Sequence, residues 1–412
     1  MQNNQKIPEG WSVKKLGECF SFLKTPSYSR AETTSDGEVH YIHYGDIHTK
    51  YPLHVCPEDI DIFVTNEQAQ KGDFLQTGDL ILLDASEDYD GTTKCIELTT
   101  IKDSDKVISG LHTLALRDNY NNFVNGFRAY ITSMPFVKNN FWKQVTGIKV
   151  YGVSKDNLKK LKLLLPPLAE QEKIAGILGT WDEAIEKLSS LIEQKKLLKK
   201  GLMQRLLTGE TRLNDFTQPW KEVKLGEICK FEIAKSKSSV IDENGKYYII
   251  DMGAVSTEGI LISNKRTNLC EDLLKVNDIV MPKDDIGGGN IIGKTAIIKQ
   301  EDAYVLSDHV FKLKIHDSDA MFISYLINSF KYNKYMRRMS SGSAILGLAK
   351  KDIEKCMLYI PSDITEQKAI ADVLSTADEE IDLLNKKLEA LKEQKKGLMQ
   401  QLLTGQTRVK VN

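Results

Sequence analysis

The sequence has few cysteines, and their spacing offers neither a disulfide framework nor a zinc site. The 412 residues include six cysteines, and none of them forms a CxxC pair. Structural zinc sites and disulfide-rich folds both depend on closely and regularly spaced cysteines. We therefore expect reduced thiols, no bound metal, and a chain long enough to build an ample hydrophobic core.

Long apolar runs and an excess of one charge are absent as well. No apolar stretch approaches the roughly 20 residues that a membrane helix needs, and the opening MQNNQKIPEGW is polar. The 56 lysines and arginines are balanced by 57 aspartates and glutamates, which leaves a net charge of −1. We expect a cytoplasmic protein of about two to four domains that contacts no membrane. Because bulk positive charge is missing, any surface for nucleic acid must be local.

One stretch of the sequence occurs twice. Residues 199–209 read KKGLMQRLLTG and residues 395–405 read KKGLMQQLLTG, so the copies differ at a single position. They lie 196 residues apart, and this offset continues without a gap back to Glu170 and Glu366. Self-similarity at a fixed offset indicates an internal duplication, so we expect two equivalent halves.

Each copy ends a long helical pattern. In the second copy, apolar residues recur at alternating steps of four and three from Ile370 to Leu402, and only Lys395 interrupts them. In the first copy the same stripe is interrupted by Lys195 and Lys199. A 4-3 stripe of this length is typical of a coiled-coil seam.

The stripes predict helices near 170–207 and 366–403, each roughly 55–60 Å long. A helical hairpin that only stabilises the fold is one interpretation. The other, favoured by the length and by the two copies, is a rigid spacer that holds two modules apart. We expect the helices to pack antiparallel, with four residues in the seam: Trp181, Leu188, Leu384 and Leu391.

Two globular segments precede the helices, from about residue 8 to 165 and from about 218 to 360. Their openings, GWSVKKLGECF and PWKEVKLGEIC, share a framework of matched residues, and the loops between later matches differ. This is the pattern expected when one scaffold must contact two different things. The matched pairs at the openings are Trp11 with Trp220, Leu16 with Leu225, and Gly17 with Gly226.

Both segments are predicted to be mostly β with some helix. Short β-rich runs such as GDLILLD and YVLSDHVFKLKI lie between Gly, Asp and Asn turns, and helices are expected near 124–134 and 319–336. The expected fold class is α/β, of the α+β kind: two similar globular domains joined by two long antiparallel coiled-coil helices with pseudo-two-fold duplication. The expected boundaries are 1–165 for the first domain, 166–212 for its helix, 213–360 for the second domain and 361–412 for the last helix.

With these motifs together, the sequence resembles the specificity subunits of type I restriction–modification systems. The resemblance is carried by the helical tails GLMQRLLTGETR and GLMQQLLTGQTR, the helix starts LPPLAEQEKIAGIL and IPSDITEQKAIADVL, and the domain openers W-x-x-x-x-LGE. It extends over essentially the full chain. It implies two target-recognition domains that each read one half of a split DNA sequence, at a distance fixed by the helices.

The resemblance also implies partners. They are double-stranded DNA, two modification (methyltransferase) subunits docked on the helices, and restriction or translocase subunits reached through the methyltransferase. The chain itself would be non-catalytic and would need no cofactor. In agreement, the sequence contains no D/N-P-P-Y/F methyltransferase signature and no plausible nucleophile–base pair.

Candidate DNA contacts are the polar and basic loop residues between the framework matches. Lys and Arg can bind phosphates or guanine edges, and Ser, Thr, Asn and Asp can read other base edges. Any one of them alone can equally be a solvated loop residue, and the segments 146–155 and 340–351 are the strongest as sets. The candidates are Lys24, Ser27, Tyr28, Arg30, His43, Tyr44, Lys94, Thr146, Lys149, Tyr151 and Lys155 in the first domain, and Lys235, Lys237, Asp251, Lys283, Asn290, Lys294, Ser341, Ser343 and Lys350 in the second.

One motif has a competing interpretation. GGNIIGKT, at 288–295, matches the phosphate-loop expression G-x-x-x-x-G-K-[ST]. A phosphate loop needs a helix directly after it, whereas the next residues, AIIKQEDAYVL, are typical of a strand. The corresponding place in the first domain, DGTTKCIEL, lacks the motif. A glycine-rich hairpin or DNA-facing loop is therefore favoured over phosphate binding.

Four of the seven histidines lie close together in the sequence, at positions 40, 43, 48 and 54. Their spacing is irregular, and the second domain has Ile250 and Asp251 at the place of His43. A metal site needs a convergent set of ligands, so we expect ordinary strand or loop histidines, with His43 as a possible DNA contact.

A rival function belongs to another class of protein. A coiled-coil scaffold whose two domains bind protein partners would share the same architecture. The near-zero net charge favours this scaffold, and the lysines beside glycines in the loops favour DNA.

Overall fold

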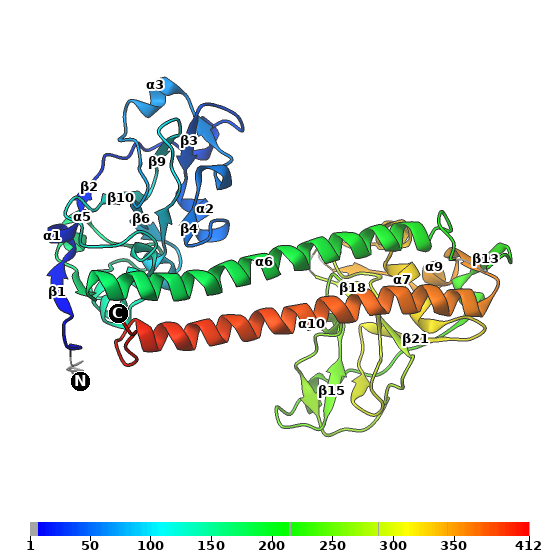
Figure 1. Ribbon diagram of the computed structural model, residues 1–412. Helices are drawn as coiled ribbons and strands as arrows, with labels where there is room; N and C mark the ends of the chain where they lie inside the picture. Colours follow the sequence, from blue (N-terminus) through cyan, green and yellow to red (C-terminus); the bar gives the residue numbers. More distant parts are fainter. Residues whose placement is uncertain (1–6, 214–215, 287, 344, 412) are drawn as a thin grey trace. The chain divides into compact units, whose positions relative to one another are not determined.

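The computed structural model describes residues 7–213, 216–286, 288–343 and 345–411 (Figure 1). The chain divides into two compact units. Unit 1 consists of Met1–Ser189 and Lys387–Asn412, and unit 2 of Ser190–Lys386. Each unit therefore contains one globular domain together with parts of both long helices. No helix within the described ranges is long and apolar enough to cross a bilayer.

Unit 1 is built around a five-stranded sheet of order β2-β10-β6-β8-β4. Its central strand β6 reads LILL and is buried throughout, because side chains cover it on both faces. A three-stranded sheet of order β5-β3-β9 and two small ladders, β1-β12 and β7-β11, complete the domain. The strands are β1 Ser12–Lys15, β2 Ser21–Phe22, β3 Val39–Ile42, β4 His54–Val55, β5 Phe63–Val64, β6 Leu80–Leu83, β7 Ala85–Ser86, β8 Cys95–Leu98, β9 Lys106–Ser109, β10 Thr113–Arg117, β11 Tyr151–Gly152 and β12 Lys162–Leu165.

Short helices connect these strands. They are α1 Leu16–Cys19, α2 Tyr44–Thr49, α3 Asn66–Ala69, α4 Pro135–Trp142 and α5 Lys155–Lys159, with 3-10 turns η1 Arg30–Glu32, η2 Pro57–Asp59, η3 Asp90–Thr93 and η4 Arg128–Ser133. The long helix α6, Leu168–Leu206, follows β12.

Unit 2 repeats this plan. A four-stranded sheet of order β14-β21-β17-β19 corresponds to the main sheet of unit 1, β16-β15-β20 to its smaller sheet, and β13-β23 and β18-β22 to its ladders. The strands are β13 Trp220–Lys224, β14 Cys229–Glu232, β15 Tyr247–Ile250, β16 Arg266–Thr267, β17 Ile279–Pro282, β18 Asp284–Asp285, β19 Ala296–Ile297, β20 Tyr304–Leu306, β21 Val310–Ile315, β22 Leu346–Gly347 and β23 Met357–Pro361. The helices are α7 Ala320–Asn328, α8 Phe330–Met339, α9 Lys350–Glu354 and α10 Ile364–Leu402, with 3-10 turns η5 Leu225–Glu227, η6 Ser238–Val240 and η7 Met252–Ala254.

The helix expected near 124–134 is wrong in position. Only the 3-10 turn η4 lies there, and the α-helix α4 begins one residue after the expected end, at Pro135. Proline at the first helical position favours helix initiation because its missing N–H is not needed there. The helix expected near 319–336 is present as two helices, because Ser329 between α7 and α8 is extended, with φ −63° and ψ 156°.

In each unit the long helices run antiparallel where they pack. In unit 1 the beginning of α6 lies beside the end of α10 (Figure 1), and Ile174 and Leu178 share one core with Leu402 and Leu403. In unit 2 the end of α6 meets the beginning of α10. Leu206, the last residue of α6, and the following Leu207 pack in one core with Ile370 and Leu374 of α10. Of the four residues expected in the seam, Leu188 is buried, and Trp181, Leu384 and Leu391 are half-buried.

The first turn of each long helix is held by the same three-residue contact. In unit 1 the buried Glu170 accepts hydrogen bonds from Trp11 Nε1 at 3.2 Å and from Arg408 Nε at 3.0 Å. In unit 2, Glu366 accepts from Trp220 Nε1 at 3.3 Å and from Arg212 Nε at 2.9 Å. The matched tryptophans and glutamates of the two sequences therefore form one structural element in each unit.

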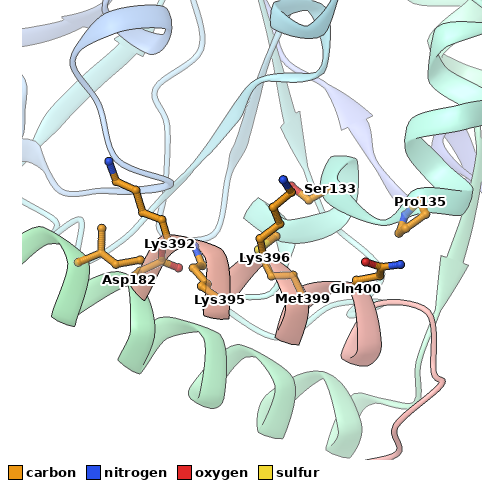
Figure 2. Close-up of a pocket in the computed structure, with 9 residues that line it drawn as sticks. Ser133, Pro135, Asp182, Lys392, Lys395, Lys396, Met399 and Gln400 are labelled. Atoms are coloured by element: carbon orange, nitrogen blue, oxygen red, sulfur yellow. Dashed lines mark hydrogen bonds and ion pairs between the residues drawn. The ribbon is translucent and has the colours of Figure 1, made fainter. Parts of the chain in front are cut away.

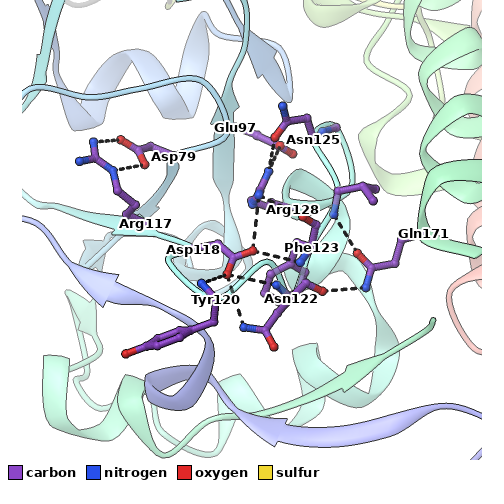
Figure 3. Close-up of polar contacts among 12 residues, drawn as sticks. Asp79, Glu97, Arg117, Asp118, Tyr120, Asn122, Phe123, Asn125, Arg128 and Gln171 are labelled. Carbon is purple, nitrogen blue, oxygen red and sulfur yellow. Dashed lines mark hydrogen bonds and ion pairs between the residues drawn. The ribbon is translucent and has the colours of Figure 1, made fainter. Parts of the chain in front are cut away.

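A buried polar network lies inside the first domain, close to the start of α6 (Figure 3). Arg128, on η4, lies 3.2 Å from Glu97 on β8 and 3.5 Å from Asp118, and both carboxylates are essentially inaccessible to solvent. Glu97 also accepts from the backbone N–H of Gly126 at 2.7 Å and of Ala129 at 3.0 Å. Because those N–H groups begin a short 3-10 turn, Glu97 acts as its cap.

The second domain has an apolar contact at the equivalent place. Glu97 pairs with Leu80 in the sheet of unit 1, and in unit 2 Ile297 pairs with the corresponding Ile279. The helix α7 takes the place of η4, and its residue Ile323 is fully buried. Its N-terminus is capped by its own Asp319, which accepts from Phe322 N at 2.8 Å.

Candidate nucleic-acid interface

Two equivalent hairpin loops precede the last ladder of each domain. In unit 1, Thr146 and Gly152 exchange backbone hydrogen bonds of 2.9 and 2.8 Å, and the enclosed residues 146–152 are called hairpin 1. In unit 2, Ser341 and Gly347 exchange bonds of the same lengths and enclose residues 341–347, called hairpin 2. The segments that were strongest as sets in the sequence therefore have the same backbone frame.

A glycine at the second position is required in both hairpins. Gly147 has φ +127° and Gly342 has φ +128°, a region that side chains with a Cβ rarely adopt. A Cβ atom on Gly147 would lie 1.9 Å from the carbonyl oxygen of Val150, and one on Gly342 would lie 2.0 Å from that of Ile345. The same backbone constraint thus recurs in both copies.

The hairpin tips present their side chains to solvent. In hairpin 1, Ile148 is 90% exposed and Val150 is 55% exposed, with the exposed Lys149 between them. In hairpin 2, Ile345 is 53% exposed and Ser343 is also exposed. Exposed apolar side chains beside polar ones are typical of contact surfaces.

The ladder at the base of each hairpin joins it to a second candidate loop. In unit 1, Tyr151 pairs with Ser86, and the ring of Tyr89 lies 5.2 Å from that of Tyr151. In unit 2, Leu346 pairs with Asp285. The structure therefore brings 86–94 together with 146–155, and 283–290 together with 340–351.

A cluster of aromatic and histidine rings adjoins this surface in unit 1. Tyr44 lies 4.6 Å from the ring of His43 and 5.3 Å from that of His112, which in turn contacts Asp84 at 3.1 Å. Lys94 donates to the carbonyl oxygen of His48 at 2.8 Å, so the 86–94 segment also meets the helix α2.

Two of these histidines have a lowered pKa, which favours the neutral ring. Burial lowers the pKa of His43, and the nearby Arg30 lowers it further. Burial and the charge of Lys94 lower the pKa of His48 in the same way. His43 is only 7% exposed and its Nδ1 accepts from the backbone N–H of Gly45 at 3.2 Å, so its assignment as a DNA contact is corrected. His48 is partly exposed, and a neutral imidazole, with one hydrogen-bond donor and one acceptor, suits recognition of base edges better than binding of phosphate.

The corresponding surface of unit 2 carries carboxylates at two positions where unit 1 has other residues or partners. Asp251, at the place of His43, accepts from Gly253 N at 3.2 Å and pairs with Lys265 at 2.5 Å. Asp284 lies 2.6 Å from His309 Nδ1 and 3.7 Å from Lys283. Carboxylates repel phosphates and accept hydrogen bonds from the amino groups of cytosine and adenine.

The sequence interpretation missed His112 and His309. Each directly precedes the strand that pairs with β6 or β17, and both have left-handed backbones, with φ 56° and φ 63°. The signal was present, because both copies place a histidine immediately before a β-rich run, in HTLALR and HVFKLK.

Tyr28 and Lys237 are not on the candidate surface. Tyr28 is only 9% exposed, and its hydroxyl donates to the carbonyl of Gln68 at 3.2 Å. Lys237 is 2% exposed and its ammonium group pairs with Asp272 at 2.7 Å. Both side chains serve the interior of their domains, so their assignment as DNA contacts is corrected.

The remaining candidates lie on the surface of the described ranges or are partly engaged there. Arg30 pairs with Asp46 at 2.6 Å, Lys155 lies 4.8 Å from the ring centroid of Phe22, and Lys350 pairs with Glu354 at 3.5 Å. Four others are exposed: Lys24, Ser27, Lys235 and Asn290.

The phosphate-loop match lacks the required geometry. Thr295 is followed by strand β19, paired with β17, so no helix N-terminus faces residues 288–295. The Thr295 side chain is fully buried and donates to the carbonyl of Ser324 at 3.0 Å. Burial lowers the pKa of Lys294. The strand expected after Thr295 is confirmed, and the phosphate-binding alternative is wrong.

The clustered histidines do not converge. His40 contacts the carbonyl oxygen of Ile60 at 2.8 Å, and His54 that of Gly126 at 2.9 Å. Among the residues that the structure describes, no three or more His, Cys, Asp or Glu side chains are placed to hold a metal ion.

Comparison with known families identifies the class of protein. The model of the type I restriction modification DNA specificity domain matches residues 8–194 and again residues 217–393. Together these matches span most of the chain, so the chain belongs to this family and carries two copies of its domain. The resemblance found in the sequence and the two-domain α+β fold class are confirmed.

Similar proteins share this architecture over their whole length. The putative type I restriction enzyme MjaX specificity subunit of Methanocaldococcus jannaschii is 26% identical, covering 98% of this chain and 95% of the relative. The MjaVIII specificity subunit of the same organism is 26% identical over the same shares of both chains. The crystal structure of a type I restriction–modification S subunit from M. genitalium has the same fold, with a TM-score of 0.64, 17% identity and 98% of each chain covered.

Proposed function

We propose that the chain is the sequence-specific DNA-binding specificity subunit of a type I restriction–modification complex. Each globular domain reads one half of a bipartite target. The long helices set the spacer between the halves and dock two modification subunits, through which the restriction or translocase subunits join. The recognition domains occupy 1–165 and 213–360, and the helical segments 166–212 and 361–412.

The observation that carries this proposal is the pair of hairpins with one backbone frame and different side chains. The described residues at the tips are Ile148, Lys149 and Val150 in hairpin 1, and Ser343 and Ile345 in hairpin 2. A constant frame with variable side chains suits two modules that must approach the same duplex and read different bases. Direct readout depends on side chains that reach base edges in a groove, and phosphate contacts only position the protein.

The surrounding side chains support different half-sites. Unit 1 combines Lys149 with His48 and Tyr44, a set suited to phosphates, guanine edges and stacking. Unit 2 places carboxylates at Asp251 and Asp284, which accept hydrogen bonds from cytosine or adenine amino groups. The proposal therefore includes an asymmetric target. Methylation and ATP-driven cleavage belong to the partner subunits, and the chain itself is non-catalytic.

A domain exchange tests the proposal. Residues 24–155 are replaced by the same region of a relative that has a different target. The relative is chosen to have tyrosine at the position of Tyr130, because the Tyr130 hydroxyl donates to Asp182 of α6. The reconstituted modification complex is then used to methylate a randomised DNA library. One half of the methylated target is expected to change and the other to stay. The matched control replaces residues 234–351 and should change the opposite half. An exchange that alters both halves, or neither, would contradict the proposal.

The near-zero net charge keeps a protein-binding coiled-coil scaffold as a second candidate function. A salt titration distinguishes DNA binding from this scaffold function. DNA binding releases counterions, so affinity falls steeply with salt. Lys149→Ala is expected to weaken binding and lower the salt slope by about one. The control is Lys187→Ala, which removes the same charge from an exposed position on α6. Equal effects of the two variants, or salt-independent binding, would favour the scaffold.

A further inference from the structure

The lysine that interrupts the apolar stripe of α10 is part of a half-buried polar cluster in unit 1. Lys395 is 9% exposed and pairs with Asp182 of α6. The other oxygen of Asp182 accepts from the hydroxyl of Tyr130 at 2.6 Å, and Lys395 Nζ lies 5.7 Å from the centre of the Tyr130 ring. Burial raises the pKa of Tyr130, as does its bond to Asp182, so the hydroxyl remains a donor.

Unit 2 contains the same cluster. Lys199 of α6 pairs with Asp378 of α10 at 2.5 Å, and the hydroxyl of Tyr325 donates to the other oxygen of Asp378 at 2.6 Å. Lys199 Nζ lies 5.5 Å from the centre of the Tyr325 ring. The three residues, their bonding pattern and the cation–ring contact all recur, although the domains that supply the tyrosines have diverged.

Stability alone does not account for these clusters. A buried ion pair is often no more stabilising than apolar residues of similar volume, because desolvation offsets the attraction between the charges. The neighbouring stripe positions of α10, such as Leu388, Leu391 and Leu398, are apolar, so an apolar residue would suit position 395. A polar group at one position of an apolar seam lowers stability and specifies the register of the helices.

Each cluster joins three separate elements at one carboxylate. In unit 1, α6 supplies Asp182, α10 supplies Lys395 and the 3-10 turn η4 of the recognition domain supplies Tyr130. A slip of one helical turn, about 5.4 Å along either helix, would separate the pair. The carboxylate thus couples the register of the two helices to the position of the recognition domain on them.

Asp182 and Lys395 line a cleft in unit 1 (Figure 2), which has a volume of about 430 Å³. Lys392 and Lys396 flank Lys395 on α10 but pair with Glu389 and Glu393 of their own helix. They therefore do not tie the helices together, and they provide matched controls on the same helix.

We propose that Tyr130, Asp182 and Lys395, and likewise Tyr325, Asp378 and Lys199, are positioning residues that fix each recognition domain on the helix pair and thereby the spacer length that the complex accepts. This inference rests on the proposed function, in which the helices set that spacer. The clusters touch no DNA. They act through the orientation of the domains that do.

The test uses the reconstituted modification complex and a DNA library in which both half-sites are constant and only spacer length varies. Tyr130→Phe removes one hydroxyl and leaves the packing intact. The preference for the optimal spacer over its neighbours is expected to fall by about tenfold, the order of a hydrogen bond to a charged group. Half-site preference, measured in a second library, should not change. Tyr325→Phe should have the same effect from unit 2.

Two further variants separate positioning from stability. The double variant D182L/K395M replaces the pair by apolar side chains and is expected to fold, with a spacer profile broader than that of Tyr130→Phe. The control Lys392→Met removes a lysine outside the cluster and should keep the sharp profile.

A sharp, unchanged profile in both the folded Tyr130→Phe protein and the folded double variant would overturn the inference. So would broadening by Lys392→Met to the same extent. A failure of the proposed function looks different, because the unaltered protein would then show no spacer optimum at all.

Discussion

The two units differ in how the interior of each recognition domain is stabilised next to its long helix. Unit 1 uses the buried Arg128–Glu97 pair, whereas unit 2 has Ile323 and Ile297 at the equivalent places. The reason lies in local structure. The 3-10 turn η4 needs Glu97 to cap its free N–H groups, and Arg128 compensates that buried charge. The helix α7 is capped by Asp319 and needs neither.

This contrast shows that one scaffold accepts either solution, provided that a buried charge has an opposite charge beside it. Apart from this difference, the two units share the contacts that fix the positions of their structural elements. These are the tryptophan–glutamate–arginine contact at each helix start, the hairpin glycines and the tyrosine–aspartate–lysine clusters. The residues inside the two domains have diverged, whereas the positions of these shared contacts have not.

The largest expected effect comes from breaking the buried Arg128–Glu97 pair of unit 1. Arg128→Met leaves Glu97 buried without a counter-charge, which typically costs about 3–5 kcal/mol. The matched change Ile323→Met in unit 2 swaps one apolar side chain for another and should cost less than about 1.5 kcal/mol. Urea unfolding, followed by hydrogen exchange in each unit, measures both. Equal costs in the two units would contradict the contrast.

A smaller effect is expected from the hairpins, where equivalent substitutions in the two units should have the same result. Gly147→Ala forces a Cβ into the Val150 carbonyl, and such backbone strain costs on the order of 1–3 kcal/mol when the loop is held in place. The loop is expected to rearrange, weakening recognition of the first half-site by about tenfold with little change in melting temperature. Gly342→Ala should do the same to the second half-site. Wild-type preference in either variant would remove that hairpin from the interface.

A pH effect should be confined to unit 1. The lowered pKa values of His43 and His48 mean that the unfolded chain takes up protons first as the pH falls below about 6.5. The stability that α2 gains from neutral histidines is present above that pH and is lost as the pH falls through the lower folded values. Hydrogen exchange of residues 44–49, corrected for intrinsic rates, should therefore accelerate on acidification more than that of residues 252–254. The variant H43Q/H48Q should lose this difference, and a difference that persists would assign it to other groups.

The smallest expected effect concerns an ion pair that occurs in unit 2 alone among the described residues. Lys195 and Glu380 are 2.5 Å apart and partly exposed, and the equivalent positions in unit 1 are Leu391 and Ala184. Exposed pairs contribute about 0–1 kcal/mol. Converting unit 2 to the unit 1 residues with K195L/E380A should shift the unfolding free energy by no more than that. A loss of several kcal/mol would show that the pair supports the seam.

The duplication and the long helices were predictable because both leave regular patterns. A fixed offset of 196 residues and a 4-3 stripe depend on nothing outside the chain segments that carry them. The strand after Thr295 was likewise predicted from β-branched residues alone.

Burial of individual polar residues was not predictable. Lys237 lies in the polar run AKSKSS, and its burial depends on Asp272, 35 residues further along the chain. Tyr28 is buried for a similar reason, because it packs with Tyr41 of β3. The lysines in the helical stripes were visible as interruptions, but their partners Asp182 and Asp378 lie on the opposite helix and required the structure.

The shared cores of the two units have a consequence for the history of the chain. The core of unit 1 includes Leu402 and Leu403 from the second copy, and the core of unit 2 includes Leu206 and Leu207 from the first. An ancestor with a single copy would therefore have lacked these leucines in its own core and presented its own helix end unpaired. Two such chains related by a two-fold axis supply each other's missing residues, as isologous dimers do. Fusion of two such genes would turn the symmetric pair into one polypeptide, in which the loops of each half can change independently.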